Sequence, residues 1–376
     1  MKDLALIVSD VPATAAGVFT KNRVVSPGVT WSRRALAKSG GCRAIVVNSG
    51  NANAVVGPKG LKDCDTITKK IAEELSIPQK EVLMASTGVI GVPLPSYKIL
   101  QAARQLAQKL GRTAKNWTDA SEAILTTDLV SKSDKVSYNY KGHRIAIGGM
   151  TKGSGMIHPN MATMLCFITT DAPVDQGFLK RSLGQSVEAS FNMIDVDGDQ
   201  STNDTVLLFS NGAAGGSRLS GASDSAVLFQ DALERLSVHL AKELVRDGEG
   251  AERIFAVTVD GAASVADARV AAREIASSSL VKAMVHGRDP NWGRIMMALG
   301  KSGAEIDEPK IDIFINDIHI VHEGKAIPYY TDAVVGGMNV PEVRFRVSLG
   351  IGESTGIAWG CDLTEEYVTF NSAYST

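Results

Sequence analysis

The stretch KGSGMIHPNMATMLCFITTD, residues 152–171, changes character at its centre. Two glycines and a proline make its first half irregular, whereas residues 164–168 form an unbroken apolar run that is typical of a buried strand. Thr163 stands at the junction between the two halves. The stretch therefore predicts a glycine-rich turn that leads into a core strand, with a hydroxyl group at the point of entry.

Short runs of β-type residues alternate with helical patterns along the rest of the chain, so we expect a mixed α/β fold. Strands are predicted at residues 44–47, 255–259, 311–315 and 343–347, and helices at 61–75, 96–110, 224–245 and 264–278. Asn316-Asp317 lies between two alternating apolar segments and predicts a tight hairpin with antiparallel pairing. No repeat, low-complexity tract or linker divides the sequence, which indicates a single unit over residues 1–376.

The composition argues against several kinds of partner. The chain has 376 residues, 44% of them hydrophobic, which is enough for a sizeable core. Lys+Arg 39 against Asp+Glu 41 give a net charge of -2, so nothing favours nucleic acid or an anionic membrane. The apolar runs are shorter than the roughly 18 residues of a spanning helix, and the first ten residues lack the basic region of a signal peptide. We therefore expect a cytoplasmic protein.

Two familiar ligand-binding motifs are incomplete in this sequence. LGKS at residues 299–302 ends like a phosphate-binding loop, but Ile295 stands where the first glycine of that loop is required. DVDGD at residues 195–199 begins like a calcium loop, but its glycine comes too early and Val206 replaces the bidentate glutamate. Neither a nucleotide site nor a calcium site is expected.

Histidines and cysteines do not form a metal-binding pattern either. His319 and His322 are the only neighbouring histidines, and on a regular strand residues three apart face opposite sides of the sheet. The four cysteines have no CxxC spacing, and we expect them to be buried small side chains rather than disulfides or metal ligands. We therefore expect no metal site. The cysteines are Cys42, Cys64, Cys166 and Cys361.

The remaining candidate for catalysis is a hydroxyl nucleophile that does not use histidine as its base. Thr163 needs a base to act as a nucleophile, and its own α-amine can serve once the Ala162-Thr163 peptide bond is cut. An α-amine has a reference pKa of about 7.7–8.0, so a useful fraction is neutral at neutral pH. The small Ala162 would let the hydroxyl reach the preceding carbonyl, so that the amide rearranges to an ester and hydrolyses. From these residues alone, a threonine that merely caps a strand is the alternative.

Two other segments carry hydroxyl groups beside turn residues. In MASTGVIGVP, residues 84–93, the Thr87 hydroxyl and the Gly88 amide are consecutive donors that could bind a developing oxyanion. LTTD, residues 125–128, lies at the end of a short helical pattern. Taken singly, each segment is equally compatible with an ordinary turn or helix terminus.

Together these segments resemble the ornithine acetyltransferase family of arginine biosynthesis, also called the glutamate N-acetyltransferase family. The resemblance covers nearly the whole chain. The matching segments are AAGVFTKN from residue 15, VNSGNANA from 47, MASTGVIG from 84, TTD from 126, KGSGMIHPNMAT from 152, DGDQSTNDT from 197, DGEGA from 247, DPNWGRI from 289 and YVTFNSAYST from 367.

The resemblance implies a self-cleaving enzyme with an N-terminal threonine. Cleavage at Ala162-Thr163 would leave fragments of residues 1–162 and 163–376, with Thr163 as nucleophile and Thr87 and Gly88 as the oxyanion hole. The fold implied is a layered α/β/β/α arrangement, rich in antiparallel strands, of the self-processing amidase type, with interwoven fragments. The substrate contacts implied are Thr126 or its neighbour Thr127, Lys152, Thr163, Glu249, Asn371 and Thr376.

The activity implied is ping-pong transfer of an acetyl group from N2-acetyl-L-ornithine to L-glutamate through acetyl-Thr163, without a cofactor. Lys152 and Glu249 would then provide opposite charges for the two ends of the substrates. We favour the bifunctional form, which also uses acetyl-CoA as a donor, and expect a heterotetramer of two copies of each fragment. A self-processing hydrolase, in which water resolves the acyl-threonine, and an uncleaved small-molecule binding protein are the alternatives.

Two features lie outside this pattern. Family members usually carry a stretch of residues before the segment that corresponds to residues 1–4. Arg288 places a positive charge just before DPNWGRI, on either the substrate side or the solvent side.

Overall fold

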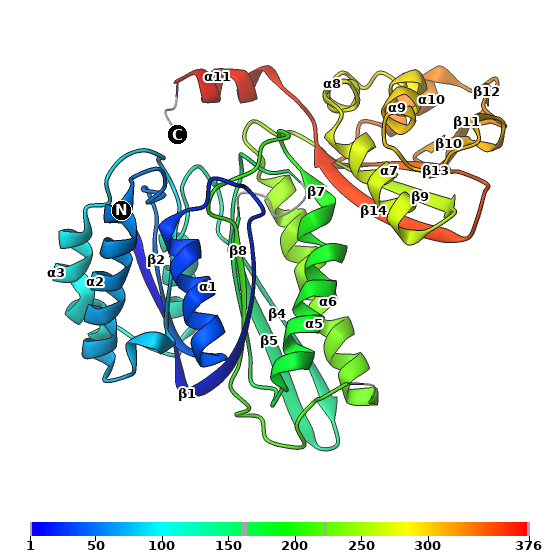
Figure 1. Ribbon diagram of the computed structural model, residues 1–376. Coiled ribbons are helices and arrows are strands. Elements are labelled where there is room, and N and C mark those ends of the chain that lie inside the picture. The colour runs from blue at the N-terminus through cyan, green and yellow to red at the C-terminus, as the bar shows by residue number, and fades with distance from the viewer. Residues whose placement is uncertain (1, 159–163, 222, 374–376) are drawn as a thin grey trace.

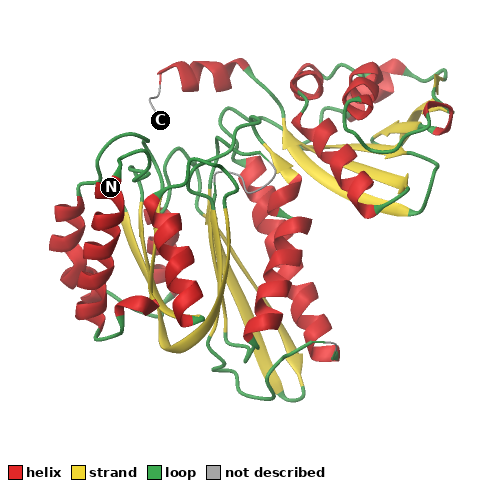
Figure 2. Ribbon diagram, in the orientation of Figure 1, coloured by secondary structure: helices red, strands yellow, loops and turns green. Residues whose placement is uncertain are grey.

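The computed structural model describes residues 2–158, 164–221 and 223–373, in which two seven-stranded sheets are flanked by helices (Figures 1 and 2). In each sheet, four of the six strand pairs within these residues are antiparallel and two are parallel. The expected mixed α/β class with antiparallel-rich sheets is confirmed.

The first sheet contains the apolar run that follows residue 163. That run forms β6 between β8 and β5, and five of its six residues are buried. β6 pairs parallel with β8 and antiparallel with β5, so strands from both sides of residues 159–163 share one sheet. The strands, in spatial order, are β3 (Val82–Ser86), β2 (Gly41–Asn48), β1 (Leu4–Phe19), β8 (Thr205–Ser210), β6 (Leu165–Thr170), β5 (His143–Lys152) and β4 (Lys132–Tyr140).

The second sheet is built from the last third of the chain together with the short strand β7. Asn316 and Asp317 have φ angles of 45° and 68°, which a tight two-residue hairpin requires, and the predicted antiparallel hairpin between β10 and β11 is confirmed. The strands, in spatial order, are β12 (Lys325–Ala326), β11 (Ile318–His322), β10 (Asp312–Ile315), β13 (Glu342–Ser348), β9 (Ile254–Ala262), β14 (Ser354–Cys361) and β7 (Ile194–Asp195).

The four helices predicted from periodicity are all present, with bounds that shift by a few residues. They are α2 (Pro58–Leu75), α3 (Ser96–Gln108), α6 (Asp224–Arg246) and α7 (Val265–Ser277). The other α-helices of the described residues are α1 (Pro27–Ser39), α4 (Ala114–Ala123), α5 (Gln176–Ala189), α8 (Ser279–Gly287), α9 (Trp292–Gly300), α10 (Thr331–Gly337) and α11 (Glu365–Ala373). Short 3-10 helices lie at Gln79–Glu81, Phe191–Met193 and Glu308–Lys310.

Helix α6 connects the two sheets. The hydroxyl of Ser223 accepts a hydrogen bond from the amide of Ala226 and caps the start of the helix. Its leucines at spacings of three and four are fully buried, in one hydrophobic cluster that includes residues of both sheets. The C-terminus of α6 therefore lies where the sheets meet. From the end of β14 that lies toward the first sheet, the chain continues into α11, which lies over the end of the first sheet (Figure 1).

The expected orientation of the two neighbouring histidines is wrong. Ile313 pairs with Val321 but Phe314 pairs with His319, so Ile320 is an extra residue, a β-bulge in β11. The bulge reverses the alternation, and the rings of His319 and His322 come within 5.3 Å of each other, centroid to centroid. The four cysteines are free and buried, as expected.

No helix in the described parts of the chain combines the length and the hydrophobicity that crossing a membrane requires.

Candidate active site

A pocket of about 170 Å³ lies where the first sheet, the end of α6 and helix α11 meet. Six of the residues predicted for the site line it, although they come from segments far apart in the sequence. These are Thr87, Gly88, Thr126, Lys152, Glu249 and Asn371. A larger hollow of about 1090 Å³ lies beside β1 and α4, but none of these six residues lines it. We assign the site to the smaller pocket because charged and hydroxyl groups converge there.

Lys152 is the last residue of β5 and is only 2% exposed. Its Nζ donates a hydrogen bond to Thr126 Oγ1 at 2.6 Å and a longer one to Thr87 Oγ1 at 3.4 Å. The ammonium group therefore holds the hydroxyls of both predicted threonines on one side of the pocket.

Asp128 compensates the buried charge of Lys152. One of its carboxylate oxygens lies 3.5 Å from Lys152 Nζ, and the other accepts from Lys132 Nζ at 2.7 Å and from the amide of Gly153 at 2.6 Å. Burial alone would raise the pKa of Asp128, but the two ammonium groups outweigh burial and hold the pKa well below its usual value. Lys132 also pairs with Asp247. The Lys152 side of the pocket is thus an alternating, buried network of charges.

Glu249 also lines the pocket, from the turn after α6. Its Oε1 accepts from the hydroxyl of Thr127 at 2.7 Å, and its Oε2 accepts from Asn371 Nδ2 at 2.9 Å. A Cβ atom at Gly155 would lie 2.5 Å from Glu249 Oε2, so any larger residue there requires this carboxylate to move. Next to it, a Cβ atom at Gly250 would lie 2.6 Å from the amide nitrogen of Tyr367, so α11 rests directly on this turn.

Thr87 and Gly88 follow β3 and line the pocket as predicted. The φ angle of Gly88 is 128°, in a region that favours glycine. A Cβ atom there would meet the carbonyl carbon of Gly50 at 2.3 Å. Glycine is therefore required both for the backbone conformation and for the close approach of the neighbouring loop.

Both threonines of the TTD segment belong to the pocket. Thr126 contacts Lys152 and Thr127 contacts Glu249, so the two neighbours bind the two charged groups of the pocket. The catalytic assignments Ala162 and Thr163, and the substrate contact Thr376, lie outside the described residues.

Asp204 is one residue that the sequence reasoning missed. Its Oδ1 accepts from the amide of Met164, the residue after Thr163, at 3.1 Å. The carboxyl is fully buried, and burial raises its pKa well above the usual value. Its Oδ2 has no hydrogen-bond partner among the described residues. Asp204 therefore holds the backbone amide with which the described segment 164–221 begins. The matching segment DGDQSTNDT contains it, but nothing in that segment singles it out.

Asp197 and Tyr367 also line the pocket and were not assigned from the sequence. Asp197 accepts from the amides of Met156 and Ile157, and burial raises its pKa to about 6. Burial and the nearby Asp197 raise the pKa of Tyr367 as well. In the sequence, the only indication that Asp197 and Tyr367 belong to the site is that each lies in a segment that matches the family.

Arg288 is at the end of α8, where its Nη1 donates to Asn339 Oδ1 at 3.3 Å on the surface. It does not line the pocket. Among the described residues, the two clusters with metal-binding side chains are Asp312, His319 and His322, and Glu252, His286 and Asp362, and neither lines the pocket.

The whole chain, residues 1–376, matches the model of the ArgJ family. It is 46% identical to the arginine biosynthesis bifunctional protein ArgJ of Symbiobacterium thermophilum over 100% of this chain and 92% of that protein. The protein of the same name from Dehalococcoides mccartyi is 44% identical, over 100% of this chain and 91% of that protein. A crystal structure of the bifunctional ArgJ of Bacillus halodurans is 40% identical with a TM-score of 0.54, and the match covers 55% of this chain and 98% of that one. The resemblance drawn from the motifs is confirmed: the chain belongs to the ArgJ family.

Proposed function

We infer that the chain is a glutamate N-acetyltransferase of arginine biosynthesis, which transfers an acetyl group from N2-acetyl-L-ornithine to L-glutamate. The observation that carries this inference is one pocket lined both by a buried ammonium group, Lys152, and by a carboxylate, Glu249. Lys152 matches a substrate carboxylate, and Glu249 matches the side-chain ammonium group of ornithine. The side-chain amide of Asn371 donates to Glu249 Oε2 and to the carbonyl of Tyr367, so it links the Glu249 carboxylate to α11.

The reaction proceeds through acetyl-Thr163. The Thr163 hydroxyl attacks the acetyl carbon of N-acetylornithine while its α-amine takes the hydroxyl proton. The oxyanion of the tetrahedral intermediate binds at the Thr87 hydroxyl and the Gly88 amide, which line the pocket together. The C–N bond then breaks, and the proton passes to the departing amine of ornithine. In the second half-reaction the amine of glutamate attacks the ester carbon, the bond between that carbon and Thr163 Oγ1 breaks, and the proton lost by the amine returns to Thr163 as N-acetylglutamate leaves.

Thr163 becomes a chain start through cleavage of the Ala162-Thr163 bond, which divides the chain into residues 1–162 and 163–376. Denaturing electrophoresis tests this step. The wild-type protein is expected to give two bands and Thr163→Ala one. A wild-type protein that stays intact and still transfers acetyl groups contradicts the mechanism.

Release of ornithine from N-acetylornithine, with and without glutamate, tests the transfer. Release that stops after one equivalent per chain without glutamate, and continues when glutamate is added, is the expected result. Sustained release without glutamate would instead identify a hydrolase that passes the acetyl group to water.

The other properties proposed are those of the bifunctional family form. They are the use of acetyl-CoA as a second acetyl donor, the absence of a cofactor, a heterotetramer of two copies of each fragment, and a cytoplasmic location. Glutamate-dependent release of free CoA thiol from acetyl-CoA tests the second donor. Native mass spectrometry of the cleaved protein tests the assembly.

A further inference from the structure

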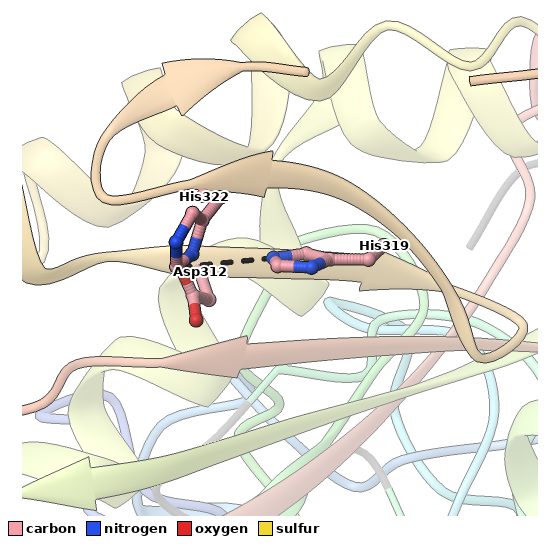
Figure 3. Close-up of side chains that lie close together, drawn as sticks. All are labelled: Asp312, His319 and His322. Carbon is pink, nitrogen blue, oxygen red and sulfur yellow. Dashed lines mark hydrogen bonds and ion pairs between the residues drawn. The ribbon is translucent and has the colours of Figure 1, made fainter. Parts of the chain in front are cut away.

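The β10–β11 hairpin of the second sheet carries a cluster of potential metal ligands that plays no part in the proposed transfer. Asp312 begins β10, and His319 and His322 belong to β11 (Figure 3). In the close-up the two imidazole rings and the carboxylate point toward one another from the two strands of the hairpin. The cluster is separate from the pocket and does not depend on the function proposed for it.

The β-bulge at Ile320 creates this cluster. Ile320 and Val321 are consecutive and both are buried, so both point to the core side of the sheet. The residues on either side of them, His319 and His322, consequently share the opposite, open side. A regular strand would separate the histidines. The bulge therefore places two imidazoles and one carboxylate within a single hairpin.

The donor atoms are close to the spacing of a metal site. His322 Nδ1 lies 3.0 Å and His319 Nε2 3.7 Å from Asp312 Oδ1, and all three donor atoms lie within 4.8 Å of one another. In a tetrahedral zinc site with bonds of about 2.0–2.1 Å, ligand atoms lie about 3.4 Å apart. The distances of 3.0 Å and 3.7 Å lie on either side of that spacing.

One donor atom of the cluster has no other role. His319 Nε2 is buried and has no hydrogen-bond partner among the described residues, although its side chain as a whole is 31% exposed. A buried polar atom without a partner is uncommon and costs free energy. A bound cation would use its lone pair.

The surroundings hold the ligands in position. The His319 ring stacks on Phe314 at a centroid distance of 4.3 Å and an angle of 15°, and Asp312 Oδ1 also accepts from the amide of Glu323 at 2.9 Å. The guanidinium group of Arg346 lies over the ring of Phe314, the stacking partner of His319. Its charge is paired with Asp260, because Arg346 Nε donates to Asp260 Oδ2 at 2.6 Å. Neighbouring groups that orient the ligands are typical of metal sites.

We propose that Asp312, His319 and His322 bind a divalent transition-metal ion of the zinc class, with water completing its coordination. Two imidazoles and one carboxylate suit zinc and leave at least one open position. The ion bridges β10 and β11 across the bulge, so its role is to stabilise the hairpin.

Calorimetric titration of the chelator-treated, full-length protein with zinc at neutral pH tests the proposal. One zinc ion per chain is expected, with affinity lowered at least about tenfold in His322→Ala and in His319→Ala. Zinc should also raise the melting temperature of the wild type by about 3 °C at one hundred times the Kd, and should not do so in the variants. Cobalt in place of zinc should give visible absorption bands only when both histidines are present.

Two matched variants separate this site from other histidines. His286→Ala removes the imidazole of the second cluster, and His239→Ala removes a surface imidazole 3.6 Å from Asp134. Both should bind zinc like the wild type. Binding that survives the loss of His319 and His322, or that His286→Ala abolishes, overturns the proposal, as does the absence of stoichiometric binding. Circular dichroism checks that each variant is folded, and the largely exposed His322 keeps the test usable if His319→Ala does not fold.

Discussion

The pocket and the β10–β11 hairpin both gather polar side chains, but they do so in opposite ways. The pocket draws its residues from seven segments of the chain, and the ammonium group of Lys152 in its wall is buried and already paired with Asp128. The hairpin assembles its cluster within residues 312–322, and His322 remains 53% exposed. Replacing one member of a buried ion pair leaves the other charge buried without a partner, which costs free energy. When an exposed group is replaced, water can solvate its former partner. The two regions should therefore respond very differently to substitution.

The largest loss of stability is expected for Asp128→Asn, because it leaves Lys152 and Lys132 without their shared carboxylate. The free energy of unfolding should fall by about 3–5 kcal/mol at neutral pH. The pKa of Asp128 is lower in the folded than in the unfolded state, so its contribution is present above about pH 4 and lost as the pH falls through the folded-state pKa. Urea unfolding at several pH values should show the difference from wild type shrinking in acid.

The control for Asp128→Asn is Asp119→Asn. Asp119 also binds two lysines, Lys2 and Lys115, but on the surface. Its replacement should leave the free energy of unfolding nearly unchanged. Equal effects of the two substitutions would show that burial does not distinguish these clusters.

Among substitutions of the residues that line the pocket, Lys152→Met is expected to cause the largest loss of activity. It removes the charge that orients Thr87 and Thr126 and that matches a substrate carboxylate. Truncating one member of a buried charge pair costs about 2–5 kcal/mol, so kcat/KM for acetyl transfer should fall at least about 30-fold. Lys242→Met is the control, since Lys242 pairs with Glu342 away from the pocket and its loss should not alter the kinetics. Similar kinetics for both variants would remove Lys152 from the site.

A smaller effect is expected for Gly155→Ala. The new Cβ atom would lie 2.5 Å from Glu249 Oε2, so Glu249 must move. Overpacking of this kind costs about 1–3 kcal/mol, and KM for N-acetylornithine should rise with it. In Gly184→Ala, within α5, the new Cβ atom meets no described atom within 4 Å, so that variant should be neutral or slightly more stable. An unchanged KM in Gly155→Ala would show that the position of Glu249 does not matter.

Asn371→Ala should have a still smaller effect, because it removes one hydrogen bond to Glu249 Oε2. A net contribution of about 0.5–1.5 kcal/mol predicts a rise in KM of about 2- to 10-fold. Ser372→Ala on the same helix, whose hydroxyl donates only to the carbonyl of Thr369 among the described residues, is the matched control. Steady-state kinetics of the two variants decide whether α11 takes part in binding.

The smallest effect is expected for His322→Ala in metal-free protein. His322 is largely exposed, and its ion pair with Asp312 should contribute less than about 1 kcal/mol to the free energy of unfolding. Urea unfolding after chelator treatment measures this contribution. A loss as large as that of Asp128→Asn would mean that the hairpin cluster is as critical as the pocket.

The strength of the local pattern explains what could be predicted from the sequence. The apolar run of β6, the helical pattern over residues 224–245 and the Asn316-Asp317 turn are local signals in the sequence. Each of the three structures was predicted correctly. The pairing of Lys152 with Thr126 and of Glu249 with Asn371 joins distant segments, so only the family resemblance pointed to them.

The features that were missed depend on the tertiary structure. Asp128, Asp197 and Asp204 function through burial and through backbone amides from other segments, which no local pattern records. The bulge at Ile320 depends on how β11 pairs with β10. The assumption that successive side chains of β11 alternate between the two faces of the sheet therefore gave the wrong orientation for His319 and His322.

Intact-mass analysis of the protein incubated with N-acetylornithine alone tests the central claim most directly. We expect two fragments, residues 1–162 and 163–376, with one acetyl group on the second and none on the first. Thr163→Ala should give one unmodified chain, and addition of glutamate should remove the acetyl group from the wild type. An uncleaved chain that transfers acetyl groups, or an acetyl group located elsewhere than on Thr163, would contradict the account.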